Sequence, residues 1–379
     1  MPKQSYNDMD IDDDLEDIAS AHGKEINKFQ KEIKKDELKI RFALIQKKQK
    51  REKNSFNSDY YSNIQNMEKI IKTDGHEDLQ KFTLEDCIGK GSESLVFKIR
   101  LNNTNNHYVL KVLKRHKNRI NYTELTISRK LKNKYIANTL CYYADPKKEF
   151  DYIIMELGNS NLSHFMKKTL KRPTMSESFL CLIAYQSLQG LLYLHTNKII
   201  HQDIKPQNII ITDYLDIKLI DLSVSSDYSE KKETFKLHYA GTQFFMSPEV
   251  IKGKTVLTKD LQKIDLFSLG VTLYVLAFGC YPFDFTKEDE DEEIYQKINS
   301  DWKVTDKNNN FSRHFIDLLN GLLEKDINKR VNIFQALNSY FVQGAKILLD
   351  EKEKTYNANS FLSYIITDHI RPFQEYISN

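Results

Sequence analysis

Cysteine is scarce in this sequence, and its spacing excludes the sites that cysteine clusters usually build. The chain has 379 residues and four cysteines, no two of which stand in a CxxC pair. A disulfide framework or a zinc site is therefore not expected. Reduced thiols fit the cytoplasm, with the nucleus as the alternative location. The four positions are Cys87, Cys141, Cys181 and Cys280.

A strong net charge and an apolar leader are also missing. The formal net charge is +3 and the signs are segregated locally, so no nucleic-acid partner is expected. The acidic stretch 8–17 stands where a secretory signal would need apolar residues. Leu266–Phe283 holds no charged side chain and reaches the length of a membrane span. Ser268 and Gly270 interrupt it, so a buried core helix and no membrane contact are expected.

The first 81 residues differ in composition from the rest of the chain. Residues 1–23 are acidic and poor in apolar side chains, which predicts disorder. Residues 24–53 lack Gly and Pro and suit a charged helix that either binds a partner protein or is simply solvated. The basic run 47–51 resembles a nuclear import signal, although such runs are more often solvated surface. Residues 54–81 are predicted to form a linker.

From residue 82 onward the sequence predicts an α+β fold with two lobes of different character. Alternating and β-branched runs predict a small, β-rich N-lobe at about 82–156. Longer helical stretches predict a larger, helical C-lobe at about 157–343. The tail, 344–379, carries apolar residues that favour docking on this domain over free solvation.

The first candidate site residues are closely spaced glycines at a turn and a lysine on the following apolar strand. Gly89 and Gly91 let backbone N–H groups approach a phosphate, although such glycine pairs are common at hairpin turns. Lys111 can hold a phosphate only if an acid orients it, and Glu124 is the single acidic residue between Lys111 and Ala144. By themselves these two would be a surface lysine and a helix-face ion pair.

A third cluster decides between these interpretations. Residues 201–208 read His-Gln-Asp-Ile-Lys-Pro-Gln-Asn, and Asp221 ends the apolar strand that follows. Phosphoryl transfer needs a carboxylate to receive the hydroxyl proton, cations against the developing charge and oxygen ligands for Mg²⁺. Asp203, Lys205, Asn208 and Asp221 supply these groups in that order, which predicts a phosphotransfer site.

This ordered set resembles the eukaryotic protein kinase family over residues 82–343. Gly89-x-Gly91-x-x-Ser94-x-Val96 matches its glycine-rich loop, and residues 201–208 match its catalytic loop. Ser247-Pro248-Glu249 resembles the end of its activation segment, with Arg330 as the usual buried partner of Glu249. Asp265 resembles the start of a helix that the family buries in its larger lobe.

The resemblance implies a bilobal kinase fold that binds ATP and Mg²⁺. Asp203 would be the general base and Lys205 would face the γ-phosphate. Lys111 would bind the α- and β-phosphates, held by Glu124, and Asn208 and Asp221 would ligate Mg²⁺. Lys205 together with Gly241-Thr242 resembles the serine/threonine branch, so the expected substrate is a serine or threonine of a protein. The other expected nucleotide contacts are Gly89, Gly91, Ser94, Val96, Val109, Met155, Glu156, Leu157 and Ile210.

Several positions depart from the family pattern. Gln202 replaces the arginine that ordinarily pairs with a phosphorylated activation segment, so we hypothesise that activity does not need that phosphate. Ser223 replaces a glycine, which makes a positive φ costlier there. Asn161 and Gln207 stand where arginine-directed kinases carry acids, so strong dependence on arginine upstream of the target is not expected.

Two alternatives to an active kinase follow from the same residues. A pseudokinase scaffold that binds nucleotide and partner proteins draws support from Gln202, Ser223, Ser94 and Ser128. A protein that acts chiefly through partner binding at residues 24–53, with catalysis secondary, is the other alternative. No residue assigned to phosphate, metal or base is missing, which favours the active enzyme.

Overall fold

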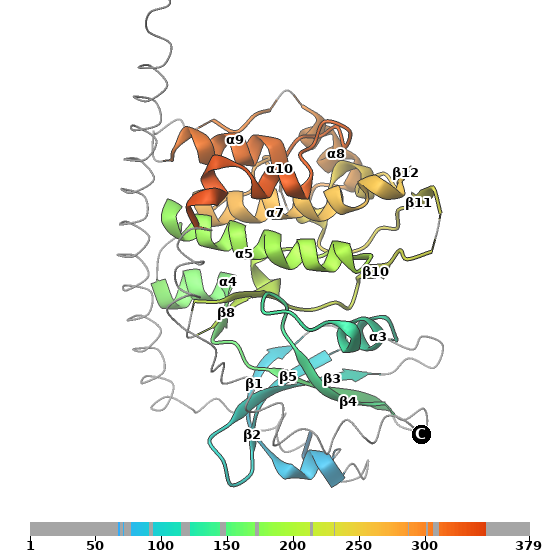
Figure 1. Cartoon of the computed structure of the whole chain (residues 1–379), viewed down its shortest axis with the longest axis vertical. Helices are drawn as coiled ribbons and strands as arrows, with labels where there is room; N and C mark the ends of the chain where they lie inside the picture. The colour runs from blue at the N-terminus through green and yellow to red at the C-terminus, as the bar shows by residue number, and fades with distance from the viewer. Residues whose placement is uncertain are drawn as a thin grey trace, which may run out of the picture.

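The computed structural model places a strand-rich lobe beside a larger helical lobe, which confirms the predicted α+β, bilobal fold (Figure 1). Residues 1–66, Gly91 and residues 346–379 lie outside the part that the structure describes. The predicted disorder at 1–23, the helix at 24–53, the basic run and nearly all of the tail fall there. The described residues are 67–68, 71, 77–90, 94–114, 122–144, 149–170, 174–212, 215–230, 232–286, 288–300, 302–305 and 311–345.

Five antiparallel strands form the sheet of the N-lobe, in the order β1-β2-β3-β5-β4. Helix α3 (Tyr122–Lys130) follows β3 and packs beside β4. The strands are rich in β-branched and aromatic residues, which suit a pleated, half-buried surface. They are β1 (Phe82–Lys90), β2 (Ser94–Leu101), β3 (His107–Lys114), β4 (Thr139–Ala144) and β5 (Phe150–Glu156).

The two faces of this sheet differ because successive side chains of a strand point to opposite sides. On β3, Tyr108, Leu110 and Val112 join one buried apolar cluster. Val109 and Lys111 alternate with them and therefore project from the opposite face. The outer face of the sheet is thus apolar, and the inner face carries the candidate phosphate-binding lysine.

Residues that precede β1 cover the apolar outer face. Met67, Ile71 and Leu79 are 2%, 4% and 2% exposed and belong to the same cluster as the outer side chains of the sheet. The 3₁₀ turn η1 (Glu77–Lys81) then leads directly into β1. The segment predicted as a linker therefore contributes to the N-lobe core. Its mostly polar composition hides the i, i+4 spacing of Met67 and Ile71, which is typical of one helix face.

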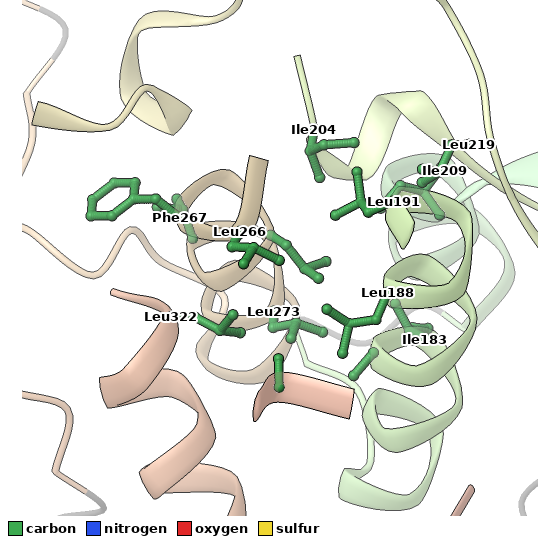
Figure 2. Close-up of a cluster of buried hydrophobic side chains, with 14 of the residues drawn as sticks. Ile183, Leu188, Leu191, Ile204, Ile209, Leu219, Leu266, Phe267, Leu273 and Leu322 are labelled. Carbon is green, nitrogen blue, oxygen red and sulfur yellow. The ribbon is translucent and has the colours of Figure 1, made fainter. Parts of the chain in front are cut away.

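Two long helices, α5 (Glu177–Thr196) and α7 (Gln262–Phe278), pack against each other at the centre of the C-lobe. Figure 2 shows their leucine and isoleucine side chains meeting, with Ile204 and Ile209 against the same core. Gly270 permits close packing of α7, because a Cβ there would lie 2.9 Å from Leu322 Cβ. The other helices of the described C-lobe are α4 (Leu162–His164), the π-helical turn η2 (Phe165–Leu170), α6 (Pro248–Ile251), α8 (Asp291–Asn299), α9 (Arg313–Leu322) and α10 (Ile333–Leu337). Three 3₁₀ turns join them: η3 (Pro206–Asn208), η4 (Gln243–Phe245) and η5 (Thr258–Asp260).

One helix that is long and apolar enough to span a membrane lies inside this lobe, and it includes the first part of the uncharged stretch Leu266–Phe283. Residues Thr258–Phe278 form the one such helix in the described part of the chain, and 72% of the window is buried within the protein. Asp265, near the start of α7, is fully buried and hydrogen-bonded. These features fit the predicted core helix.

Three small sheets hold the segments that carry the candidate site residues. Strands β6, β8 and β9 form one of them. Of the two predicted metal ligands, Asn208 directly precedes β8 and Asp221 lies two residues after the end of β9. The pairs β7–β10 and β11–β12 attach the chain that follows Asp221 to the C-lobe. Backbone hydrogen bonds therefore fix both ends of the candidate site. The strands are β6 (Ser160–Asn161), β7 (Ile199–Ile200), β8 (Ile209–Ile211), β9 (Ile217–Leu219), β10 (Ser226–Asp227), β11 (Thr234–Lys236) and β12 (Thr255–Leu257).

Candidate active site

Lys111 connects the two lobes through a pair of carboxylates. Its Nζ lies 2.7 and 3.0 Å from the two carboxylate oxygens of Glu124 on α3, and 2.8 Å from Oδ1 of Asp221. Lys111 and Glu124 are 7% and 3% exposed. A charged group is buried at this depth only when it is paired, so the two N-lobe residues hold each other in place. Residues 110 positions apart in the chain thus meet at one cation.

The titration of these groups follows from burial and mutual attraction. Burial alone would raise the pKa of Asp221, but the nearby Lys111 ammonium and a hydrogen bond from Ser223 outweigh it and lower the pKa to about 2. Burial lowers the pKa of Lys111, and the Glu124 and Asp221 carboxylates reverse this and raise it above its ordinary value. Burial raises the pKa of Glu124 despite the opposing effect of Lys111. Asp221 and Lys111 are therefore charged at neutral pH, as phosphate and metal binding require.

Asp203 is the centre of a second hydrogen-bond network, on the loop between β7 and β8. Lys205 Nζ lies 2.6 Å from its Oδ2, and Asn208 Nδ2 donates to the same oxygen at 2.7 Å. Thr242 Oγ1 donates to Oδ1 at 2.7 Å and accepts from Lys205 Nζ at 2.6 Å. Three donors from two separate segments thus fix the orientation of one carboxylate.

The two predicted Mg²⁺ ligands are compatible with that ion. The Nδ2 of Asn208 donates to the carbonyl and the carboxylate of Asp203, which turns the amide oxygen to the opposite side. Asn208 lies next to β8, and its carbonyl accepts from Ile220 N, next to Asp221. In the described part of the chain no three His, Cys, Asp or Glu residues gather as a metal site. Mg²⁺ usually takes one or two protein oxygens and completes its shell with phosphate and water, so these two residues fit it.

The predicted nucleotide contacts of the N-lobe share the inner face of the sheet. The register pairs Gly89 with Val96, Val96 with Lys111, and Val109 with Met155. A Cβ on Gly89 would lie 3.3 Å from Val96 Cβ, so glycine eases the close approach of the two strands. Ser94 is the first residue of β2 and follows β1 after the turn that connects the two strands. The sheet therefore carries the described ones among these residues beside the lysine.

At the junction of the lobes, two of the predicted nucleotide contacts, Ile210 and Glu156, have different surroundings. Ile210 on β8 packs against the junction, because a Cβ on Gly158, next to Leu157, would lie 2.6 Å from Ile210 Cδ1. The side chain of Glu156 instead turns to Lys218, with Oε1 2.7 Å from Nζ, and accepts from Asn138 N at 3.1 Å. The carboxylate of Glu156 is thus directed at the C-lobe, and a nucleotide contact at this residue stays a prediction. Its side chain joins the lobes.

Buried Asp265 of α7 fixes the backbone of the catalytic loop. Its two carboxylate oxygens accept from His201 N at 2.9 Å and from Gln202 N at 2.8 Å, and His195 lies 2.8 Å away. Burial opposes ionisation of Asp265, but the hydrogen bonds and charge of His195 help to lower its pKa. Gln202 and Asp221 both have φ of +67°, an unfavourable conformation for a non-glycine residue that such fixed surroundings stabilise.

Comparison with known proteins agrees with this geometry. The family described as "Protein kinase domain" matches residues 82–342. The chain belongs to the protein kinase family. As the family pattern implies, Arg330 of this kinase donates to both oxygens of Glu249, at 2.6 and 3.0 Å, and the pair is buried.

Three curated kinases illustrate the similarity. The MAP kinase kinase MKK1/SSP32 of Saccharomyces cerevisiae is 30% identical over 277 residues, which cover 68% of this kinase and 52% of the yeast protein. The serine/threonine-protein kinase dst2 of Dictyostelium discoideum is 29% identical, over 75% of this chain and 24% of its own. PLK4 of Drosophila virilis is 26% identical, over 70% and 33%. This kinase thus matches about half of the length of the yeast relative and a third or less of the other two.

Sequence reasoning missed several residues of the kinase site. Thr242 served only as a marker of the serine/threonine branch, yet its hydroxyl donates to the carboxylate of Asp203. Lys218 and Ser226 carried no signal, because a lysine in a short strand and a serine in a polar run are common. Their partners, Glu156 and Gln202, lie 62 and 24 positions away, distances that no local pattern reveals.

Proposed function

We propose that this chain is an ATP- and Mg²⁺-dependent protein kinase that transfers the γ-phosphate of ATP to serine or threonine hydroxyls of protein substrates. The observation that carries the proposal is the convergence of Lys111 on Glu124 and Asp221, with Asp203 and Asn208 hydrogen-bonded to each other on the adjoining loop. Family membership alone supports phosphotransfer to proteins. The arrangement of charges supports the finer statement.

The chemistry assigns one task to each group. The substrate hydroxyl oxygen forms a bond to the γ-phosphorus, the bond from that phosphorus to the β,γ-bridging oxygen breaks, and ADP leaves. The hydroxyl proton passes to the carboxylate of Asp203, which Thr242 and Lys205 orient. When bound, Mg²⁺ would be held by Asn208 and Asp221 and would neutralise negative charge on the phosphates. Lys111 would neutralise the α- and β-phosphates, because Glu124 holds its ammonium in the buried position.

Lys205 and Thr242 support serine or threonine as the acceptor. The Lys205 ammonium lies 2.6 Å from the carboxylate that would receive the proton, so it can also reach the phosphoryl group in transit. The Thr242 hydroxyl closes the network on the other oxygen. These two residues match the serine/threonine branch in the sequence. Their hydrogen bonds hold the Asp203 carboxylate and the Lys205 ammonium next to each other.

A transfer assay tests the proposal. The purified full-length chain is incubated with ATP labelled on the γ-phosphate, Mg²⁺ and generic protein substrates, and the labelled amino acids are identified after hydrolysis. We expect phosphoserine or phosphothreonine, and a rate about 10²- to 10⁴-fold lower for Asp203→Asn, which keeps the shape of the side chain but cannot accept the proton as a carboxylate does. Labelled tyrosine as the main product would refute the acceptor assignment. A wild-type chain that binds ATP without any transfer would favour the scaffold alternative.

A further inference from the structure

Two serine hydroxyls join the activation segment (residues 221–249) to the catalytic loop. Ser226 Oγ donates to Gln202 Oε1 at 2.6 Å, and Ser225 Oγ donates to the carbonyl of His201 at 3.1 Å. Gln202 is 7% exposed and Ser225 is 3% exposed. A buried amide oxygen that loses its donor keeps the cost of desolvation, so each contact favours the observed arrangement.

Gln202 is also a contact point for the far end of the activation segment. A Cβ on Gly241, whose φ is +101°, would lie 2.2 Å from the Gln202 carbonyl oxygen. Any other residue at 241 would therefore displace the loop. Thr242, which follows, contacts Asp203, which itself follows Gln202. One residue thus touches both ends of the activation segment and is adjacent to the proposed base.

Backbone pairing holds two further stretches of the described activation segment. Strand β10 pairs with β7, and Tyr228 OH donates to the carbonyl of His195 at 3.0 Å. Strand β11 pairs with β12, and Leu237 N donates to the carbonyl of Lys254 at 3.0 Å. These contacts join neutral groups and need no phosphate. The bond from Ser226 to Gln202 instead joins two side chains, one near the start of the segment and one on the residue that precedes Asp203.

We propose that Ser226 is a positioning residue for phosphotransfer. Through Gln202 its hydroxyl holds the activation segment against the catalytic loop, in the place where a phosphate paired with arginine would otherwise be needed. The inference rests on the proposed function, because it concerns the arrangement of Asp203. It assigns a role to a serine in a polar run, and it gives a structural reason for activity without phosphorylation of this segment.

The experiment compares four phosphatase-treated full-length proteins: wild type, Ser226→Ala, Ser226→Thr and Ser229→Ala. The last is a matched control, because Ser229 is an exposed serine of the same segment whose contacts are with Asp227. The readouts are kcat, KM for ATP, and amide hydrogen exchange across residues 222–245. Loss of one neutral hydrogen bond predicts a kcat about 3- to 10-fold lower for Ser226→Ala, with KM for ATP within about twofold and faster exchange in the segment. Ser226→Thr restores both, and Ser229→Ala changes neither.

Distinct outcomes separate this inference from the proposed function. Wild-type kcat and exchange in Ser226→Ala would overturn the inference, and so would a loss that Ser226→Thr does not restore. If phosphatase treatment removed most of the wild-type activity, the neutral contacts would be insufficient and the inference would fail. A wild type without any transfer would count against the proposed function, while the exchange rates would still report on the contact.

Gln202→Met tests the same contact from the catalytic loop and covers the case in which Ser226→Ala folds poorly, and a double-mutant cycle combines the two substitutions. Gln202→Met removes the amide oxygen at similar volume. If the two side chains act through each other, the kcat of the double variant equals that of either single variant. If the fold loss in kcat of the double variant were the product of the two single losses, the side chains would act independently, which contradicts the proposal.

Discussion

The cover of the N-lobe sheet leads to a stability prediction far from the active site. Leu79 is 2% exposed and packs with Met67, Ile71 and the outer side chains of the sheet, although it precedes the residues that match the family. Truncation of a buried leucine to alanine costs about 2 to 5 kcal/mol, from lost transfer energy and the cavity left behind. At this burial we expect about 3 kcal/mol for Leu79→Ala. For a domain of this size that lowers Tm by about 6 to 12 °C.

Thermal unfolding of the full-length chain, followed by circular dichroism, measures the effect. The control is Phe334→Ala, a larger truncation at a side chain that is 63% exposed, for which we expect a change of less than about 0.5 kcal/mol. Leu79→Ala, although the smaller truncation, is therefore predicted to lower the free energy of unfolding more than Phe334→Ala does. A Tm for Leu79→Ala within about 2 °C of wild type would show that the segment before β1 does not stabilise the N-lobe.

Three further predictions concern the charged groups of the site. Lys111→Met leaves the carboxylates of Glu124 and Asp221 without their shared cation. We therefore expect phosphate transfer to fall below detection, and the free energy of unfolding to drop by about 3 to 5 kcal/mol in a denaturant titration. A fully active Lys111→Met would contradict the assignment. The folded pKa of Asp221 is about 2 and its ordinary value is 3.8, so its carboxylate adds stability that is full well above pH 3.8 and is lost as pH falls toward 2. The difference in unfolding free energy between wild type and Asp221→Asn should therefore change over that range, and a constant difference would argue against the ion pair. Thr242→Val removes the donor to Asp203 Oδ1, so kcat should fall about 3- to 10-fold and Thr242→Ser should restore it; equal kcat values for the three proteins would refute the role of the hydroxyl.

The fold and the central site residues were predictable because they follow local patterns. Strands with alternating apolar residues, and the ordered set Lys111, Asp203, Asn208 and Asp221, are visible along the chain. Chemistry fixes which residue types phosphotransfer needs, so their spacing identifies the site before its geometry is known. The structure adds the distances that join them, such as 2.8 Å from Lys111 to Asp221.

The missed features depend on contacts between distant segments. The ion pair between the Glu156 side chain and Lys218 had no signal in the sequence, because Lys218 belongs to no motif. Residues 54–81 were predicted to form a linker, yet Met67, Ile71 and Leu79 pack against the apolar face of the sheet. Gln202 was read as a loss of charge. Its hydrogen bond with Ser226 shows what the neutral side chain gains.

Calorimetric titration with ATP, in the presence and absence of Mg²⁺, tests the convergence of these residues most directly. If Asn208 and Asp221 hold the ion beside the phosphates that Lys111 contacts, Mg²⁺ tightens ATP binding to the wild-type chain, and Asp221→Asn loses about 10- to 100-fold of that affinity while binding free ATP as before. Equal affinity of wild type and Asp221→Asn for ATP with Mg²⁺, or no effect of Mg²⁺ on the wild type, would contradict a shared magnesium–nucleotide site.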